Sequence, residues 1–161
     1  MTGPLASDRP PGAVPDAALR TGDLIAGKYK IDRVLGKGGV GVVVAARDTQ
    51  LQRKVAVKFL RTRGLAFPGA RERFLREAQA AVAIHSEHVA RVIEFGTLDS
   101  GAPFIVMEYL TGVDLGDFLE KRGALPVSLA VDYVLQACEA IAEAHALGII
   151  HRDLKPPNLF L

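Results

Sequence analysis

The stretch HRDLKPPN at residues 151–158 decides how the rest of the chain is interpreted. Transfer of a phosphoryl group to a hydroxyl requires of one loop an aspartate, a lysine and an asparagine at close spacing. Asp153 can accept the hydroxyl proton, Lys155 can neutralise the moving phosphate, and Asn158 can hold a magnesium ion. The stretch therefore predicts a loop that handles phosphate and metal together.

A second stretch, GKGGVG at residues 36–41, has the spacing G-x-G-x-x-G. This spacing alone is a weak signal, because dinucleotide-binding folds use it too, and there the glycines open a helix. Here three valines follow directly at residues 42–44, and β-branched residues favour a strand. The glycines are therefore predicted at the tip of a hairpin whose amides can cover phosphates. A bulky side chain at Gly36, Gly38 or Gly41 would hold that backbone away, although an ordinary glycine-rich hairpin is the alternative.

Together with VAVK at residues 55–58, these stretches resemble three signatures of one family. They are similar to the catalytic loop H-R-D-L-x-x-x-N, the glycine-rich loop G-x-G-x-x-G-x-V and the V-A-I-K strand of protein kinases. Lys155 resembles the serine/threonine branch, and the wordings GGVG, MEYL and SEHV are typical of bacterial members. Residues from about 29 to 161 thus resemble the N-terminal half of a bacterial eukaryotic-type (Hanks-type) serine/threonine protein kinase domain, from the N-lobe through the catalytic loop.

The resemblance implies ATP and Mg²⁺ as cofactors. It assigns catalytic roles to Asp153, Lys155, Lys58 and Glu77, and makes Asn158 the metal ligand. Lys58 would pair with the α- and β-phosphates, and a carboxylate from the following helix would hold its flexible stem. Glu77 matches that carboxylate because it lies near the middle of the predicted helix with apolar neighbours three and four residues away. Glu72 is the competing choice.

The resemblance also implies a nucleotide pocket. Its residues are Gly36, Lys37, Gly38, Gly39, Gly41, Val43, Ala56, Lys58, Met107, Glu108, Leu110, Asp114 and Phe160. Met107 takes the gatekeeper position, and backbone groups of Glu108 and Leu110 would bond the adenine edge. Asp114 matches the acidic position that bonds the ribose, while Phe160 would lie below the base. A small apolar slot with a few fixed polar groups suits a flat aromatic ligand.

The expected fold class is α+β: a protein-kinase-like N-lobe with a five-stranded antiparallel sheet and one helix, then the first helices of an incomplete helical C-lobe. Apolar patterning predicts strands near 29–35, 42–46, 55–60, 89–95 and 104–109. Helices are predicted over 70–84, 115–122 and 128–147. The domain organisation is a Pro/Ala-rich disordered tail over 1–22, the N-lobe over 23–108, and the hinge with the start of the C-lobe over 109–161.

Composition narrows the function classes. The net charge of +2 is too small to argue for nucleic acid or an anionic membrane surface as a partner, and no apolar run is long enough to span a membrane. A single cysteine allows no disulfide within the chain, which fits a reducing, cytoplasmic setting. His85 and His88 have the spacing of half a metal site, but a third ligand is missing from their surroundings, so a structural role is expected.

Two functional hypotheses remain. In the first, the protein is an enzyme that phosphorylates serine or threonine of a protein substrate. In the second, the chain is a catalytically inactive fragment that binds nucleotide or docks on another protein. The D-F-G magnesium ligand and the activation segment of the family lie beyond residue 161, so residues 1–161 alone are expected to transfer little phosphate. The apolar helix over 128–147 is expected to recruit a covering partner. The glycine hairpin and the terminal loop are expected to face each other across one cleft.

Overall fold

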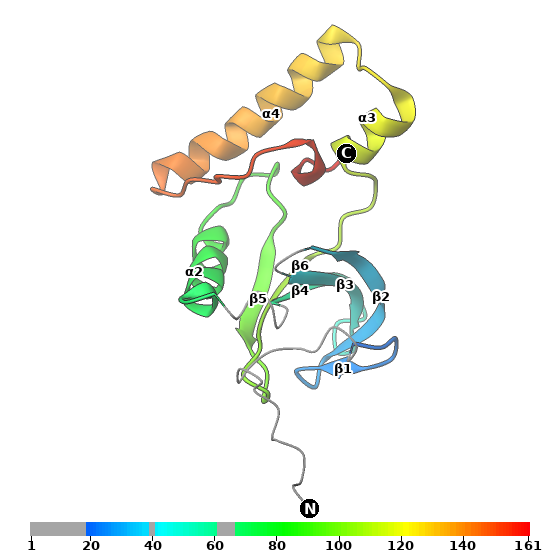
Figure 1. Ribbon diagram of the computed structural model, residues 1–161, viewed down its shortest axis with the longest axis vertical. Helices are drawn as coiled ribbons and strands as arrows, with labels where there is room; N and C mark the ends of the chain where they lie inside the picture. The colour runs from blue at the N-terminus through cyan, green and yellow to red at the C-terminus, as the bar shows by residue number, and fades with distance from the viewer. Residues whose placement is uncertain (1–18, 39–40, 61–66) are drawn as a thin grey trace, which may run out of the picture. The chain divides into compact units, whose positions relative to one another are not determined.

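The computed structural model describes residues 19–38, 41–60 and 67–161 (Figure 1). Its contacts divide the chain into two compact units. Of the described residues, the first unit contains those from 19 to 79 and from 92 to 109, and the second contains residues 80–91 and 110–161. The second unit is therefore built from two stretches that the sheet strands separate along the chain.

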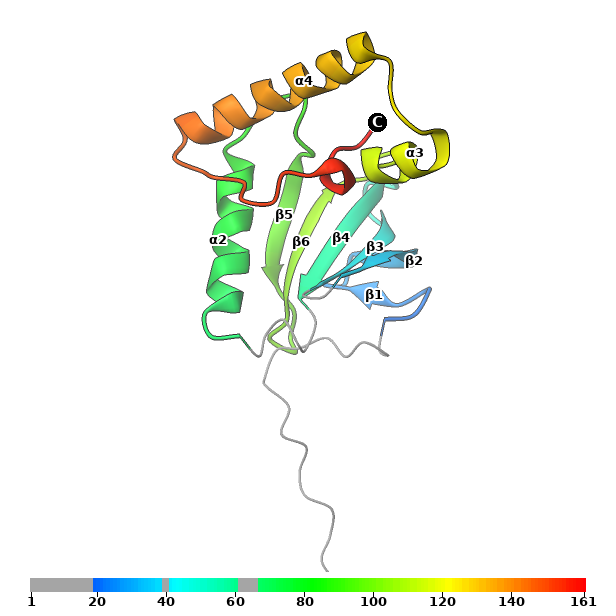
Figure 2. The ribbon, with the colours of Figure 1, turned by 45° about the horizontal axis from the view of Figure 1, so that its top comes forward.

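The first unit is built on one curled antiparallel sheet in the order β1-β2-β3-β4-β6-β5 (Figure 2). Its strands are β1 Leu24–Ile25, β2 Tyr29–Lys37, β3 Gly41–Asp48, β4 Lys54–Leu60, β5 Val92–Thr97 and β6 Pro103–Glu108. Five of them correspond to the predicted strands. The two-residue β1 was not predicted, and β5 begins three residues later than expected. The sheet therefore has six strands and not the five expected, because the short edge strand β1 was missed.

Strict alternation along β4 gives the sheet two different faces. Val55, Val57 and Phe59 lie fully buried in the main core, together with apolar side chains of β2, β3 and β6. Residues 56, 58 and 60 point to the opposite face, because successive side chains of a strand alternate. Burial of β-branched residues on the core face fixes the register, since a one-residue slip would expose them.

Helix α2, Ala70–Val82, covers part of the second face. Its buried residues Phe74 and Ala78, four residues apart, pack in one cluster with Leu60 of β4 and Ile105 of β6. The spacing places both on one side of the helix, as the sequence pattern indicated. Figure 2 shows α2 running beside β5.

Residues 19–22, which the sequence placed in the tail, contact the sheet. Leu19 packs against the main core, and Thr21 Oγ1 donates to the Asp32 carbonyl at 3.1 Å. The Gly22 amide donates to the Ile31 carbonyl at 2.8 Å. The other residues of the predicted tail, 1–18, lie outside the described part of the chain.

The second unit contains helices α3, Leu115–Arg122, and α4, Val127–Ala146, and the 3-10 turn η1, Pro156–Asn158. The bounds of α3 are those predicted, because Asp114 caps its first turn and Gly123, at φ 79°, ends it. After α4 the chain returns and ends beside α3 (Figures 1 and 2). Residues 159–161 form a short backbone pairing with residues 113–115.

One side of α4 is apolar and exposed. Val127, Val131, Val134 and Leu135 each expose about half of their surface or more. Their spacing of three and four residues gathers them in one stripe. Among the described residues, no helix combines the length and apolar character needed to cross a bilayer.

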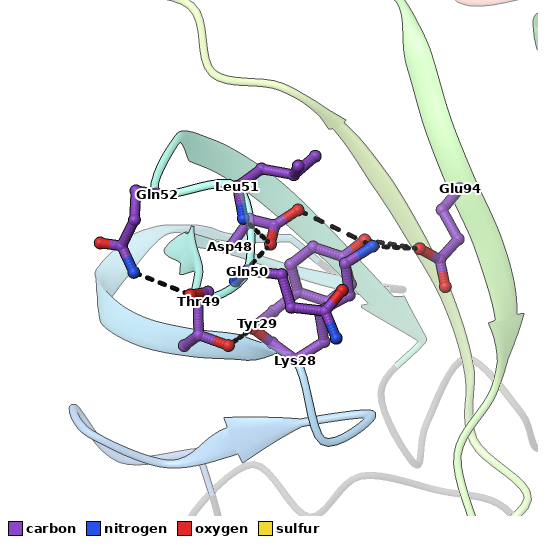
Figure 3. Close-up of polar contacts among 8 residues, drawn as sticks. All are labelled: Lys28, Tyr29, Asp48, Thr49, Gln50, Leu51, Gln52 and Glu94. Atoms are coloured by element: carbon purple, nitrogen blue, oxygen red, sulfur yellow. Dashed lines mark hydrogen bonds and ion pairs between the residues drawn. The ribbon is translucent and has the colours of Figure 1, made fainter.

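A buried polar network closes the base of the β2–β3 hairpin (Figure 3). Asp48 is fully buried, and its Oδ1 accepts hydrogen bonds from the amides of Gln50 and Leu51, both at 3.0 Å. The hydrogen bond from the Leu51 amide contributes most to lowering the pKa of Asp48 below its ordinary value. Its Oδ2 accepts no hydrogen bond from the described residues and lies 3.7 Å from Lys28 Nζ. The ion pair therefore has to compensate that buried oxygen.

Lys28 also links the hairpin to β5. Its Nζ lies 3.3 Å from Glu94 Oε2, and the Tyr29 hydroxyl donates to the same oxygen. Burial, followed by this bond, raises the pKa of Tyr29. Figure 3 shows Lys28 and Tyr29 reaching Glu94 across the sheet, so three separate segments share one charge cluster.

We expect Asp48→Asn to destabilise the protein at neutral pH, because the neutral amide loses the Lys28 ion pair and the charge-assisted amide bonds. The pKa of Asp48 is lower in the folded protein, so its ionised form stabilises the fold above the ordinary carboxyl pKa. That contribution is lost as the pH falls through the folded value, and the gap between the two proteins should narrow there. Urea unfolding at several pH values measures this. Asp99→Asn, at an exposed turn, is the control, and an equal response of both variants would contradict the expectation.

Candidate functional site

Two polar side chains of the 151–158 loop, Lys155 and Asn158, meet at the carboxylate of Asp153. Lys155 Nζ lies 2.9 Å from Asp153 Oδ1. The Asn158 side-chain amide donates to Asp153 Oδ2 at 3.1 Å and to the Asp153 carbonyl at 2.7 Å. The sequence predicted that these residues act together, and the structure brings both Lys155 and Asn158 within hydrogen-bond distance of Asp153.

These donors set the protonation of Asp153. The hydrogen bond from Lys155, and then that from Asn158, hold the pKa of Asp153 below its usual range. The carboxylate is therefore ionised at neutral pH, the form that can accept a proton. Asp153 and Lys155 expose 63% and 51% of their side chains, so the pair remains open to a reacting group.

The backbone before Asp153 is unusual. Arg152 has φ 63°, a left-handed conformation that costs a non-glycine residue about 1–2 kcal/mol. The Asp153 amide donates to His151 Nδ1 at 3.3 Å, so the histidine contacts the loop backbone. Strain of this kind concentrates at functional sites, where the surrounding structure imposes it.

The far end of the loop is fastened to the segment before α3. Val113 and Leu161 exchange backbone hydrogen bonds at 3.3 and 2.9 Å, and the Leu115 amide donates to the Leu159 carbonyl at 2.7 Å. Asp114 lies opposite Phe160 in this pairing. Two residues assigned to the nucleotide pocket from distant parts of the sequence are therefore neighbours.

Asp114 has a structural task as well. Its Oδ1 accepts the Asp117 amide at 2.8 Å and so caps α3. A carboxylate at this position satisfies an amide of the first turn and interacts favourably with the helix dipole. The assignment of Asp114 to the ribose came from the family resemblance, and the cap is a second reason for the same residue.

The glycine stretch joins two strands, as the β-branched run predicted. Gly36 pairs with Val43 and Lys37 with Val42, and the Gly38 amide donates to the Gly41 carbonyl at 2.9 Å. Gly39 lies outside the described residues. Among the described residues, a Cβ at Gly36 would meet nothing within 4 Å, whereas one at Gly41 would lie 2.8 Å from the Phe59 carbonyl oxygen. Packing against β4 is therefore sufficient reason for glycine at 41, independent of any ligand.

Four predicted nucleotide contacts share one face of the sheet. Val43 pairs with Lys58, and Ala56 pairs with Met107, so these residues occupy adjacent positions on β3, β4 and β6. All four belong to the face opposite the main core, because they alternate with its members. Glu108 ends β6 beyond Met107, and Leu110 is partly exposed at the start of the second unit.

The predicted ion pair between Lys58 and Glu77 is not formed. Both residues are described, and their charged atoms are not within ion-pair distance, so the assignment of Glu77 as the partner of Lys58 stays a prediction. Lys58 Nζ instead lies 5.9 Å from the centre of the Phe74 ring, one turn before Glu77 on α2. Phe74 occupies the packed side of the helix, and Glu77 is exposed beside it. The competing choice, Glu72, is exposed too and makes no ion pair with Lys58.

Comparison with known proteins identifies the family. The model of the protein kinase domain matches residues 29–161. The chain belongs to the protein kinase domain family. It is 39% identical over 147 residues to the serine/threonine-protein kinase pkn3 of Myxococcus xanthus, covering 91% of this chain and 27% of that protein. It therefore spans about a quarter of that relative's length.

Solved kinase structures agree with the fold. The PknI kinase domain of Mycobacterium tuberculosis has a TM-score of 0.79 and 31% identity, over 89% of this chain and 59% of that one. A structure of Rad53 1-466 in complex with AMP-PNP has a TM-score of 0.72 and 30% identity, over 83% of this chain and 34% of that one. The relatives confirm the bacterial serine/threonine kinase resemblance and the kinase-like fold class.

Two further contacts of this kinase domain were not predicted. His88 Nε2 lies 3.2 Å from Glu139 Oε2, and the His85 amide donates to Glu143 Oε1 at 2.7 Å. Glu139 and Glu143 are one turn apart on α4, so they fasten the loop after α2 to one side of that helix. The i, i+4 carboxylates could have been found in the sequence, but their partners could not.

Glycines 112 and 116 of the kinase domain were also missed. They stand two residues on either side of Asp114, and both face the returning chain. A Cβ at Gly112 would lie 1.9 Å from the Leu161 carbonyl oxygen, and one at Gly116 would lie 2.9 Å from Pro157 Cγ. The symmetric pattern G-x-D-x-G is the signal that could have pointed to them.

We expect Gly112→Ala to separate the 113–115 and 159–161 pairing. Gly112 has φ 146° and Gly123 has φ 79°, but no atom lies within 4 Å of a Cβ at Gly123. Gly123→Ala should therefore lower the free energy of unfolding by about 1–2 kcal/mol from backbone strain alone. Gly112→Ala should cost about 1–3 kcal/mol more, because a close contact is added to the strain. Urea unfolding compares them, and equal losses would rule out the close contact with Leu161.

Proposed function

We propose that the protein carrying this chain is a serine/threonine protein kinase, which transfers the γ-phosphoryl group of ATP to hydroxyls of a protein substrate. The observation that carries the proposal is the convergence of Lys155 and Asn158 on the two carboxylate oxygens of Asp153, at 2.9 and 3.1 Å. Membership of the kinase family and the complex of the similar protein Rad53 with AMP-PNP support a nucleoside triphosphate as the ligand.

Asp153 would act as the general base. Bound ATP would supply the phosphoryl group, and Mg²⁺ would screen its negative charge. The ionised Asp153 would orient the substrate hydroxyl and take its proton as the oxygen attacks the γ-phosphorus, while the bond from that phosphorus to the β,γ-bridging oxygen breaks and ADP leaves. Lys155 can leave Asp153 and pair with the transferred group, since an ion pair this exposed holds its partners weakly. The depressed pKa keeps Asp153 in its basic form into mildly acidic solution.

The residues present fit a magnesium ligand at Asn158. Its Nδ2 is engaged by Asp153, and none of the hydrogen bonds described for the loop uses Oδ1. A carbonyl oxygen held in this way is a suitable ligand for Mg²⁺, which binds oxygen and retains several waters. We therefore assign Asn158 Oδ1 to the metal, with the Asp153 bond fixing the orientation of the amide.

The first unit would bind the nucleotide through one face of its sheet. Lys58 would pair with the phosphates, and the amides of the glycine hairpin would cover them. Val43, Ala56 and Met107 supply apolar surface for the base, and their shared face supports this role. Backbone groups of Glu108 and Leu110, Asp114 and Phe160 complete the proposed set.

A second candidate function is nucleotide binding without transfer. The separation of Lys58 from Glu77 favours it, because kinase transfer requires this ion pair. The two candidates differ in one measurement: transfer of radiolabelled phosphate should accompany ATP binding in the first and be absent in the second. We prefer the first, because Asp153, Lys155 and Asn158 have no purpose in simple binding.

Two further proposals concern the setting of the protein. We propose a cytoplasmic location for the kinase domain, where ATP is available. The exposed apolar stripe of α4 is the place where a covering protein partner is expected.

We expect Asp153→Asn to lower phosphate transfer by the protein that carries this chain by about 10²–10⁴-fold, the usual effect of removing a general base. Transfer of radiolabelled phosphate from ATP to a generic serine-rich protein measures the loss. Asp132→Asn, which neutralises an exposed carboxylate of α4, is the matched control and should retain activity. Full activity of the Asp153 variant would remove the proposed base.

We expect Lys58→Met to weaken ATP binding by about thirtyfold or more, since losing one partner of a close charge pair costs about 2 kcal/mol or more. Isothermal titration calorimetry with Mg-ATP measures the affinity. Lys54→Met removes the same charge from the same strand, four residues away, and should bind ATP as the unchanged protein does. Equal ATP affinities of the two variants would show that Lys58 does not bind the phosphates.

A further inference from the structure

The first turn of α3 rests on the ring of Pro157. An ideal Cβ built on Gly116 would lie 2.9 Å from Pro157 Cγ, 3.2 Å from Pro157 Cδ and 3.1 Å from Asp114 Oδ1. Contacts this short are not tolerated by carbon atoms, so the ring and the helix are as close as a glycine allows. Figures 1 and 2 show η1 against α3.

Residue 116 is glycine because a larger side chain would collide with Pro157, and not because the backbone conformation requires glycine. Gly116 lies inside α3, and its φ is not in the left-handed region. Alanine is the better helix former, so a glycine here weakens the helix unless a neighbour demands the room. The neighbour is Pro157, whose ring cannot rotate away as a flexible side chain would.

Pro157 transmits this contact to the loop residues. Pro157 stands directly before Asn158 in η1. The backbone amide of Asn158 donates to the Lys155 carbonyl at 2.9 Å and closes that turn. On the other side, the Leu115 amide fixes the Leu159 carbonyl at 2.7 Å. The position of Asn158 is therefore set between a steric stop at Pro157 and a hydrogen bond at Leu159.

We propose that Gly116 is a positioning residue: by admitting the Pro157 ring, it sets how closely η1 approaches α3, and thereby where the Asn158 amide lies beside Asp153. The importance of this for the reaction rests on the proposed role of Asn158 as a metal ligand. The geometric part does not, because it concerns only contacts within the second unit.

Asn158 is the only asparagine in the sequence, which makes the test direct. Selective ¹⁵N-asparagine labelling of the full chain gives one side-chain amide signal in an NMR spectrum, and no metal or nucleotide is needed. In the unchanged protein this amide donates to Asp153 and should resonate away from the position of asparagine in an unfolded chain. Gly116→Ala should shift it toward that position, because the added methyl group displaces η1.

A size exchange supplies the decisive comparison. Pro157→Ala alone should also move the signal, since the stop is removed. Combined with Gly116→Ala, it should return the signal close to its original position, because the new methyl group fills the space of the ring. This non-additivity is the signature of direct contact. Pro156→Ala, which changes the neighbouring proline, should fail to restore the signal of Gly116→Ala.

The proposal is overturned if Gly116→Ala leaves the signal in place, or if Pro156→Ala restores it as well as Pro157→Ala does. Should Gly116→Ala unfold the chain, judged by circular dichroism, Pro157→Ala decides alone, and an unmoved signal overturns the proposal. A separate addition of Mn²⁺ with ATP tests the function: line broadening of the Asn158 signal supports the metal role. Absence of broadening would count against that role while leaving the Gly116 result standing.

Discussion

The register of β4 between β3 and β6 is the constraint on which the first unit depends. Every second residue of β4 is buried in the main core, so the strand cannot slip by one position without exposing Val57 and Phe59. The same alternation places Lys58 on the opposite face, between Val43 and Ile105. Hydrophobic burial on one face therefore decides which charged group the other face presents.

In the second unit, the charged side chains are positioned by backbone pairing and not by burial of a strand. An exposed ion pair such as that of Asp153 and Lys155 is too weak to hold a loop in one geometry. The loop is instead held at its end by the backbone pairing of residues 113–115 with 159–161.

Much of the fold could be predicted because local patterns agreed with tertiary packing. The valines after the glycine stretch gave a strand, and the cap at Asp114 with Gly123 gave the bounds of α3. The edge strand β1 has two residues, too few for alternation to be visible. The start of β5 was placed too early because Val89 and Val92 have equal strand propensity, and only pairing with β6 distinguishes them.

In the candidate site, too, contacts between residues close in sequence could be predicted, and contacts between distant residues could not. The spacing within 151–158 was enough to predict that Asp153, Lys155 and Asn158 meet, because few bonds separate them. Whether Lys58 and Glu77 meet could not be decided in this way, because sequence spacing gives the side of a helix but not its rotation against a sheet. The roles of Gly112 and Gly116 depend on residues far along the chain, and no local pattern contains that information.

The arrangement around Lys58 indicates what would have to change before an ion pair with Glu77 could form. Phe74 and Ala78 anchor α2 in an apolar cluster, and Glu77 lies between them in sequence on the exposed side. To reach Lys58, the carboxylate must replace the Phe74 ring beside the ammonium group, either by a new rotamer or by a turn of the helix about its axis. A contact between a cation and an aromatic ring is worth less than a close ion pair in a desolvated place. Exclusion of water around Lys58 would strengthen an ion pair more than the ring contact, and would therefore shift this balance toward Glu77.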